Sequence, residues 1–115
     1  MKIQHERHLK GWGYEDWIVN TELYCGKILH VNKGKKCSLH FHEVKTETMH
    51  ISSGSVIMRY GKEVGHLIEV TLTKGQSFHI VPGLFHQFEA LEDSDIFEFS
   101  TQHFEEDSKR VMKGD

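Results

Sequence analysis

Three histidines and one glutamate in this sequence are spaced so that they could bind a metal ion. In the segment SLHFH, residues 38–42, two histidines alternate, and side chains two apart in a β-strand point to the same face. After the polar stretch 43–46, which we expect to form a hairpin, Glu47 would lie opposite the pair. Another histidine begins a predicted strand just after the Pro82-Gly83 turn. The sequence therefore predicts one divalent metal ion, bound by His40, His42, Glu47 and His86.

This ligand set does not select one metal. Three imidazoles and one carboxylate suit Zn, Mn, Fe or Ni, and in an octahedral ion they leave two positions for water or substrate. Simpler interpretations exist for the histidines: His40 and His42 as a surface pair on a half-exposed strand, and His86 as a histidine hydrogen-bonded in a turn. The shared spacing favours the metal site. The other histidines have no such spacing, and we expect them to be solvated or locally hydrogen-bonded.

Further residues are predicted to line the same cavity. Met49 has the strand parity of Glu47, and Phe88 has that of His86, so both should form apolar walls beside the ion. The predicted substrate-lining residues are Ser38, Lys45, Met49 and Phe88.

Glu98 is the candidate catalytic residue. It stands in the segment IFEF, residues 96–99, where a charged side chain between two phenylalanines faces either solvent or the metal cavity. If it faces inward, its carboxylate could exchange protons with a bound substrate.

Short β-rich segments between recurrent turns must position these side chains. Glycines and polar clusters separate segments rich in β-branched and aromatic residues, which are typical of strands. The predicted strands cover residues 27–31, 38–42, 48–51, 56–60, 67–72, 77–81, 87–91 and 96–101. Between residues 21 and 101 no sustained helical period occurs. About eight short strands at close spacing indicate an all-β antiparallel sandwich or barrel, of which the jelly roll is one form.

The ends of the chain are predicted to pack around this barrel. We expect a single domain over residues 1–115, with the barrel core at about 21–101. The first sixteen residues carry Trp12 and Tyr14, aromatics that would be costly to expose, so this arm should pack on the barrel or on a second subunit in a homodimer. The charged tail, residues 103–115, is expected to form a short helical turn or a strap over the barrel.

Composition narrows the class of partner. The 115 residues carry 14 Lys and Arg against 17 Asp and Glu, a net charge of -3, so no excess positive charge is available for nucleic acid. The two cysteines form no CxxC pair, which favours a reducing compartment. No apolar run resembles a signal peptide or a membrane span. We therefore expect a cytoplasmic protein whose partner is a small molecule rather than nucleic acid or a membrane.

These residues resemble the cupin superfamily. Gly34, His40, His42, Glu47 and Gly54 reproduce its first motif, G(X)5HXH(X)4E(X)6G, with every spacing intact. Gly75, Gly83 and His86 fit the second motif, G(X)5PXG(X)2H, although Val81 stands at its proline and Ala90 at its usual asparagine. The resemblance implies a single jelly-roll barrel that binds one metal ion.

A closer resemblance is to the C-terminal cupin domain of type II mannose-6-phosphate isomerases. The opening Trp12-Gly13-Tyr14, the stretch from His42 to Glu47 and the closing segment from Glu105 to Arg110 are similar to that domain. His40 stands where that family often has Gln, and Lys45 where it has Arg. The resemblance implies a carbohydrate ligand.

The resulting hypothesis is an aldose-ketose isomerase for a sugar or sugar phosphate, acting through a metal-stabilised enediolate with Glu98 as base. The alternatives are another metal-dependent cupin enzyme, such as an iron-dependent dioxygenase or a lyase, and a carbohydrate-binding cupin without turnover, because one ligand set supports several chemistries on one fold.

Overall fold

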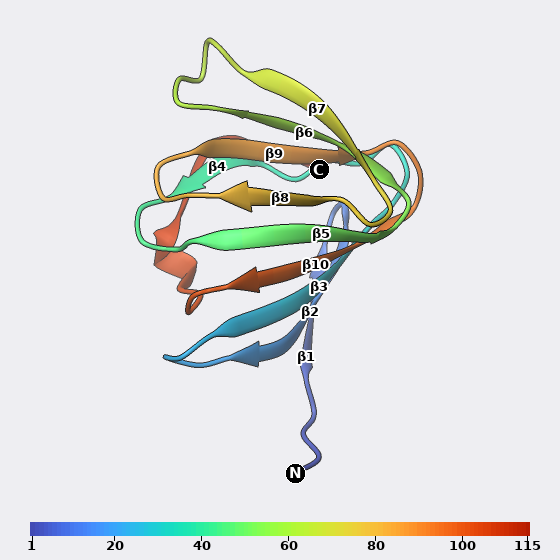
Figure 1. The fold of residues 1–115 in the computed structure, drawn as a ribbon, viewed down its shortest axis with the longest axis vertical. Coiled ribbons are helices and arrows are strands. Elements are labelled where there is room, and N and C mark those ends of the chain that lie inside the picture. The colour runs from blue at the N-terminus through green and yellow to red at the C-terminus, as the bar shows by residue number, and fades with distance from the viewer.

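The chain folds into two antiparallel β-sheets that face one another. The computed structural model describes all 115 residues and contains a six-stranded sheet A, ordered β1-β2-β3-β10-β5-β8, and a five-stranded sheet B, ordered β11-β4-β9-β6-β7 (Figure 1). The only helical segment is a 3-10 turn of three residues. The prediction of an all-β jelly-roll barrel is confirmed.

The strands are short and follow one another closely along the chain. Sheet A contains β1 (Glu6–Lys10), β2 (Gly13–Asn20), β3 (Cys25–Val31), β5 (Glu47–Ser53), β8 (Ser77–Ile80) and β10 (Ser94–Ser100). Sheet B contains β4 (Leu39–His42), β6 (Ser55–Gly61), β7 (Ile68–Thr73), β9 (Phe85–Ala90) and β11 (Ser108–Met112). All eight predicted strands are present as β3 to β10, with ends that differ by a few residues.

The hairpin β1–β2 was not predicted from the sequence as strand. It extends sheet A beyond β3, and β1 forms the sheet's free edge. The residues of β1 are mostly exposed, so their side chains show no apolar alternation. The N-terminal arm packs on its own barrel through Trp12, which is buried and meets the Phe88 ring edge-on at 5.2 Å between centroids.

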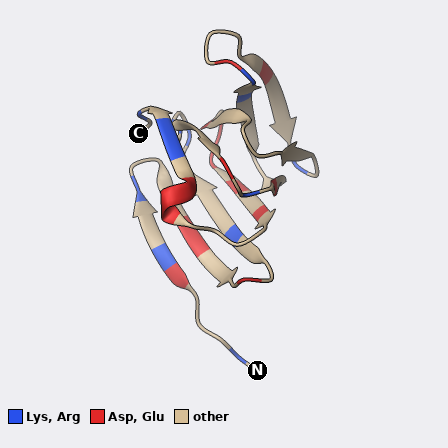
Figure 2. Ribbon diagram, turned by 90° about the vertical axis from the view of Figure 1, so that its left-hand side faces the viewer, with Lys and Arg blue, Asp and Glu red and all other residues tan.

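The C-terminal tail forms both a helical turn and a strap. The 3-10 turn η1 (Glu105–Asp107) is acidic throughout and is drawn in red in Figure 2. Strand β11 follows directly and pairs with β4, with Ser108 opposite His42 and Arg110 opposite His40. The tail is therefore built into sheet B beside two of the predicted metal ligands.

Side chains that alternate inward fill the space between the sheets. On β3, residues 25, 27, 29 and 31 are buried while those between them are partly exposed, as expected for a strand with one face on the core. The fully buried apolar side chains include Leu29, Val31, Ile51, Val56, Met58 and Ile96. Burying each of these contributes about 1.5–3 kcal/mol to folding, so this cluster is the main source of stability.

Gly54 occupies a turn that only glycine fits. It joins β5 to β6 with a φ of 88°, a conformation that side chains with a Cβ rarely adopt. A Cβ at this position would also collide with the Ser94 side chain and the backbone of Asp93. The tight turn sets how β5 and β6 pass from one sheet to the other.

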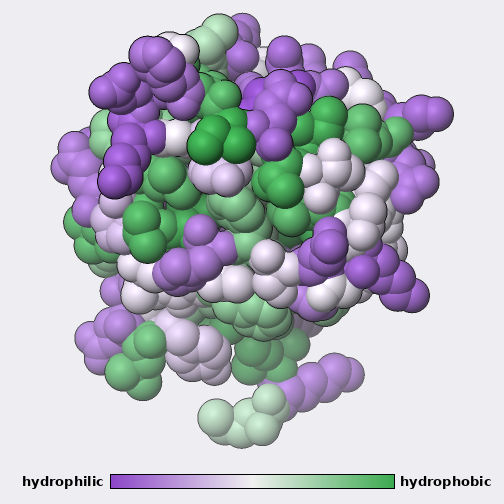
Figure 3. Space-filling model, turned by 45° about the horizontal axis from the view of Figure 1, so that its top comes forward, coloured by the Kyte–Doolittle hydropathy of each residue, from purple (hydrophilic) through white to green (hydrophobic).

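The outer surface mixes polar and apolar side chains. Figure 3 shows them interspersed over the visible face, and Figure 1 shows the N-terminal segment projecting away from the sheets. The structure contains no helix with the length and apolar character required to cross a bilayer.

Candidate metal centre

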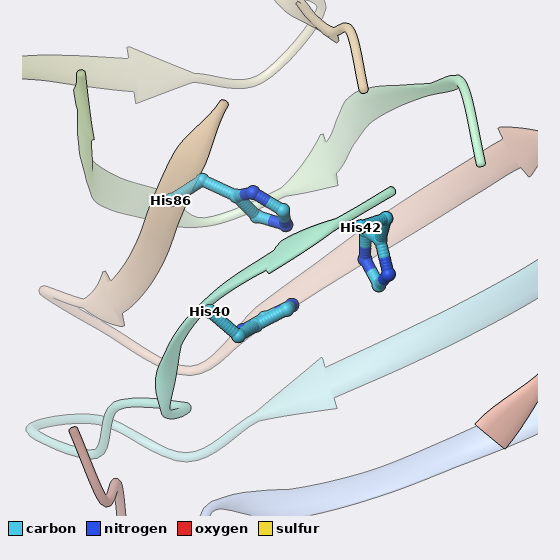
Figure 4. Close-up of side chains that lie close together, drawn as sticks. All are labelled: His40, His42 and His86. Atoms are coloured by element: carbon cyan, nitrogen blue, oxygen red, sulfur yellow. The ribbon is translucent and has the colours of Figure 1, made fainter. Parts of the chain in front are cut away.

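Three histidine rings converge in the interior of the barrel. Strand β4 supplies His40 and His42, and the neighbouring strand β9 supplies His86, which pairs with His40 in register. Their rings point toward one another (Figure 4), and one nitrogen from each lies within 4.8 Å of the others. The ring centroids of His40 and His86 are 4.3 Å apart. These three side chains could hold one metal ion.

Backbone carbonyls orient all three imidazoles in the same way. Each ring directs its Nδ1 to a main-chain oxygen; the acceptors are those of Ser38, Asp107 and Leu84, at 2.9, 3.2 and 2.9 Å from His40, His42 and His86 respectively. A carbonyl oxygen can only accept, so each Nδ1 carries the proton. Each Nε2 is then left with a free lone pair, the tautomer that a metal ligand requires.

Burial keeps these imidazoles neutral. Removal from water lowers the pKa of His40 to about 3, an effect reinforced by His86, and lowers the pKa of His42 to about 3, reinforced by Lys45. The same cause lowers the pKa of His86 to about 4. Neutral imidazole is the form that binds a metal, so the rings need not lose protons at neutral pH.

Glu47 approaches the histidines from the opposite sheet. It begins β5, is 1% exposed, and places Oε2 at 3.5 Å from His42 Nε2 and Oε1 at 3.6 Å from His86 Nε2. Burial raises the pKa of Glu47 to about 7, and the charge of Glu98 adds to this. A nearby cation would favour the ionised carboxylate.

One ligand atom at this point is buried without any partner. His86 Nε2 has no hydrogen-bond partner, whereas Glu47 Oε2 contacts the Lys45 ammonium at 2.9 Å. Buried polar atoms are normally satisfied, and an unsatisfied one costs about 1–3 kcal/mol. A cation between His86 Nε2 and the Glu47 carboxylate would bind both, so the donor set fits the predicted divalent metal.

A cavity of about 450 Å³ opens beside the histidines. Its walls include all four residues predicted to line it, namely Ser38, Lys45, Met49 and Phe88. Met49 and Phe88 are almost fully buried and form its apolar part. The volume lies in the range usual for small-molecule sites.

A buried ion-pair network forms the polar wall of this cavity. Glu98 is 4% exposed, so it faces the interior, and its Oε2 accepts a hydrogen bond from Lys45 Nζ at 3.0 Å. Lys45 also donates to His103 Nδ1 at 3.1 Å. Burial alone would raise the pKa of Glu98, but the positive charges of Lys45 and Lys27 outweigh it and lower the pKa to about 2. Glu98 is therefore ionised at neutral pH.

A second buried lysine adjoins this network. Lys27 lies next to Glu98 in the β3–β10 register, and its side chain is 2% exposed. The Nζ atom lies 3.4 Å from Glu15 Oε1 and 4.3 Å from the centroid of the Trp17 ring. The cavity therefore presents alternating positive and negative groups opposite the histidines.

The expected hairpin between His42 and Glu47 is wrong. Strand β4 pairs with β9 and β11, whereas β5 pairs with β10 and β8. The stretch 43–46 instead crosses from sheet B to sheet A. Glu47 consequently faces the histidines across the barrel, which still brings the carboxylate beside them.

Sequence reasoning missed several cavity residues. His103 was expected to be solvated or hydrogen-bonded locally, yet it lies in the cavity wall against Lys45. Lys27 and Glu15 were not singled out. The inward parity of Lys27 between Cys25 and Leu29 on β3 was a usable signal, because a lysine on a core face must find a partner. His103 had none, since it follows the last strand of sheet A.

The sequence matches the cupin domain over residues 27–99, more than half of the chain. The chain therefore belongs to the cupin domain family. No curated protein sequence matches it.

Solved structures of larger proteins contain the same fold. The capsular polysaccharide assembling protein CapF from Staphylococcus aureus superposes with a TM-score of 0.83 at 17% identity, over 96% of this chain and 35% of CapF. Oxalate decarboxylase from Bacillus subtilis superposes with a TM-score of 0.83 at 19% identity, over 93% of this chain and 30% of that chain. The chain thus spans about a third of the length of either protein, and the likeness at this identity concerns the fold.

Proposed function

We propose that the protein binds one divalent metal ion through His40, His42, Glu47 and His86. The support is the convergence of three correctly oriented, neutral imidazoles with a buried carboxylate, together with the unsatisfied His86 Nε2. Structures of the similar oxalate decarboxylase concern its Mn(II) centres. Zn, Mn, Fe and Ni all suit this ligand set.

We further propose that this site serves an aldose-ketose isomerase acting on a sugar or sugar phosphate. The observation that carries the proposal is the buried Glu98 carboxylate, hydrogen-bonded to Lys45, in the wall of the cavity that His40 and His42 also line. The resemblance of Trp12-Gly13-Tyr14 and of Glu105 to Arg110 to type II mannose-6-phosphate isomerases adds the substrate class. The cavity's charged wall suits a ligand with many hydroxyl groups.

In such a reaction Glu98 would move one proton between neighbouring carbons. It accepts the proton from the hydroxyl-bearing carbon beside the substrate carbonyl and returns it to the former carbonyl carbon, while the hydroxyl proton passes to the former carbonyl oxygen, so no net proton is gained or lost. The bound cation would supply Lewis-acid stabilisation of negative charge on the substrate oxygens. Lys45 holds the Glu98 carboxylate in place through its 3.0 Å hydrogen bond.

Deuterium exchange tests this proposal directly. We expect protein supplied with Mn, Fe, Zn or Ni to interconvert mannose 6-phosphate or mannose with the matching ketose, and to place solvent deuterium on the exchanged carbon, as followed by NMR. Glu98→Gln should remove this exchange while leaving metal binding intact. The exposed Glu92, changed to Gln, is the matched control. Unchanged sugars with every metal would contradict the isomerase.

Two alternatives give different outcomes in the same assays. Oxygen consumption that requires ferrous iron, or cleavage of an acid substrate, would instead favour a dioxygenase or lyase. Sugar binding without any proton exchange would favour a binding module. The inward position of Glu98 favours an enzyme over a binding module. In a binding module, this buried carboxylate in the cavity wall would have only a structural role. Under all three, His40→Ala should abolish metal binding.

We also propose a homodimer, in the cytoplasm. Trp12 packs inside its own barrel and is not available to a second subunit. The support for a dimer is an apolar groove on the outside of sheet A, lined in part by Ile18, Val19, Ile28, Phe97 and Phe99. Phe99 is 56% exposed. Both cysteines are buried free thiols, in keeping with a reducing compartment. A solution mass equal to one chain in sedimentation would contradict the dimer.

A further inference from the structure

The loop that joins the two ligand-bearing sheets is held by a residue far away in sequence. Residues 43–46 connect β4, which carries two of the histidines, to β5, which begins with Glu47. The acidic turn η1 lies against this loop, and Asp107, its last residue, is 7% exposed. Its charge is therefore directed into the protein rather than to solvent.

The Asp107 carboxylate accepts hydrogen bonds from three consecutive backbone amides. Oδ1 accepts from the N–H groups of Glu43 and Val44 at 2.9 and 3.1 Å, and Oδ2 accepts from that of Lys45 at 3.0 Å. Successive N–H groups that point to one place form an anion-binding concavity. Burial would raise the pKa of Asp107, but these three hydrogen bonds lower it below its ordinary value. The carboxylate and the loop thus fix each other's conformation.

The same residue also orients a metal ligand. The backbone oxygen of Asp107 accepts the hydrogen bond from His42 Nδ1 at 3.2 Å. Strand β11 continues from Asp107 and pairs with β4, which places Ser108 opposite His42. The other two histidines take their orienting carbonyl from the residue two positions earlier in the sequence, just before the strand begins. His42 is the only one that depends on a segment 65 residues away.

We propose that Asp107 is a positioning residue for the metal centre. Through its carboxylate it fixes the loop that presents Lys45 and Glu47, and through its carbonyl it fixes the His42 ring. The inference rests on the proposed metal site, since it concerns how tightly that site binds its ion. Partners that orient metal ligands typically change metal affinity by about 10- to 100-fold when they are removed.

The adjoining residue in the same turn gives a matched control. Glu106 is exposed, and its removal takes the same charge from η1 without touching the loop. A general effect of the tail's acidity would appear in both variants. A positioning effect appears only when Asp107 is changed.

The test combines hydrogen exchange of the metal-free protein with Mn²⁺ binding. In Asp107→Ala the amides of residues 43–45 should exchange faster than in the unchanged protein and in Glu106→Ala. Mn²⁺ titration followed by electron paramagnetic resonance should show affinity about 10- to 100-fold weaker in Asp107→Ala and unchanged in Glu106→Ala. Asp107→Asn keeps one accepting oxygen, so its amide exchange and its Mn²⁺ affinity should lie between those of Asp107→Ala and those of the unchanged protein. It replaces Asp107→Ala in the test if that variant does not fold.

The outcomes separate this inference from the metal site itself. If the unchanged protein and His40→Ala both fail to bind Mn²⁺, Zn²⁺, Fe²⁺ and Ni²⁺, the proposed site is wrong, and the positioning role that depends on it is overturned as well. If the unchanged protein binds Mn²⁺ and the Asp107 variants bind it equally well, only the positioning role is overturned. Slow exchange at residues 43–45 in both Asp107 variants would also overturn it.

Discussion

The two ends of the barrel interior are built from the same strands but have opposite chemistry. On β10, Ile96 and Glu98 are two residues apart and both face the interior. On the neighbouring strand β3, Leu29 pairs with Ile96 and Lys27 pairs with Glu98. Ile96 and Leu29 belong to the apolar core, and Leu29 also lines the cavity. Glu98 and Lys27 form part of the charged wall of that cavity. A step of two residues along either strand therefore leads from the apolar core to the charged wall.

The difference shows how a small barrel can carry a polar site. The polar end is buried almost as deeply as the core, with Glu98 at 4% exposure and Glu47 at 1%. Buried charges are tolerated only when paired and hydrogen-bonded. The network around Lys45 meets that requirement, and the apolar end offsets its cost.

The largest expected effect of the polar end is on the stability of the metal-free protein in acid. The three site histidines are neutral in the folded, metal-free protein with pKa values of about 3 to 4, whereas unfolded histidines protonate near pH 6.5. Below that pH the unfolded histidines bind more protons, so their contribution to stability is complete above about pH 6.5 and is lost as the pH falls toward the folded values. Glu47, with its pKa raised to about 7, offsets part of this loss, because the folded protein takes up a proton there that the unfolded chain binds only at lower pH. Urea unfolding at several pH values should show this decline.

Exposed histidine provides the control for acid stability. The control variant is His66→Gln, which removes a histidine whose side chain is 84% exposed and leaves the buried cluster intact. Replacing His40 by Gln should flatten the profile, because one neutral buried imidazole is removed. A metal-free protein whose stability does not change between about pH 7 and pH 5 would contradict the neutral buried cluster.

The next largest effect is on the ion-pair network. Lys45→Met leaves the buried carboxylates of Glu47 and Glu98 without their shared cation, and breaking a buried pair in this way costs about 3–5 kcal/mol. Chemical denaturation measures the loss. Adding Glu98→Leu should restore part of it, since the two side chains interact directly and their effects are not additive. A loss typical of an exposed pair, below about 1 kcal/mol, would show that the wall is not truly buried.

The smallest effect concerns the apolar end. Ile96→Val removes one methylene from a residue that is 0% exposed and should lower the free energy of unfolding by about 0.5–1.5 kcal/mol. The Mn²⁺ affinity of the folded protein should not change. A weaker affinity in this variant would mean that the two ends are mechanically coupled rather than separable.

Local patterns were sufficient to predict strands β3 to β10 and the convergence of His40, His42 and His86. The alternation of His40 and His42 follows directly from strand geometry, and His86 needed only the position of the next strand after Pro82. The β-rich segments between glycines were recognisable because one face of each is apolar.

Long-range placement could not be predicted in the same way. The path of residues 43–46 depends on which sheet β5 joins, and that is decided by its pairing with β10 and β8 rather than by the loop's own residues. Strands β1 and β11 have mostly exposed side chains, so no periodicity marks them. Asp107 and His103 reach the site only through the tail's return to β4 and the cavity, more than 50 residues from their partners.

The way in which the imidazoles are oriented has an evolutionary consequence. The acceptors for His40 and His86 are the main-chain oxygens of Ser38 and Leu84, and an amino-acid replacement does not remove a carbonyl. The Leu84 side chain can therefore change without turning the His86 ring, whereas the Ser38 hydroxyl also lies 3.2 Å from His40 Nδ1. Ligand geometry inherited through the backbone can persist while most of the surrounding sequence diverges.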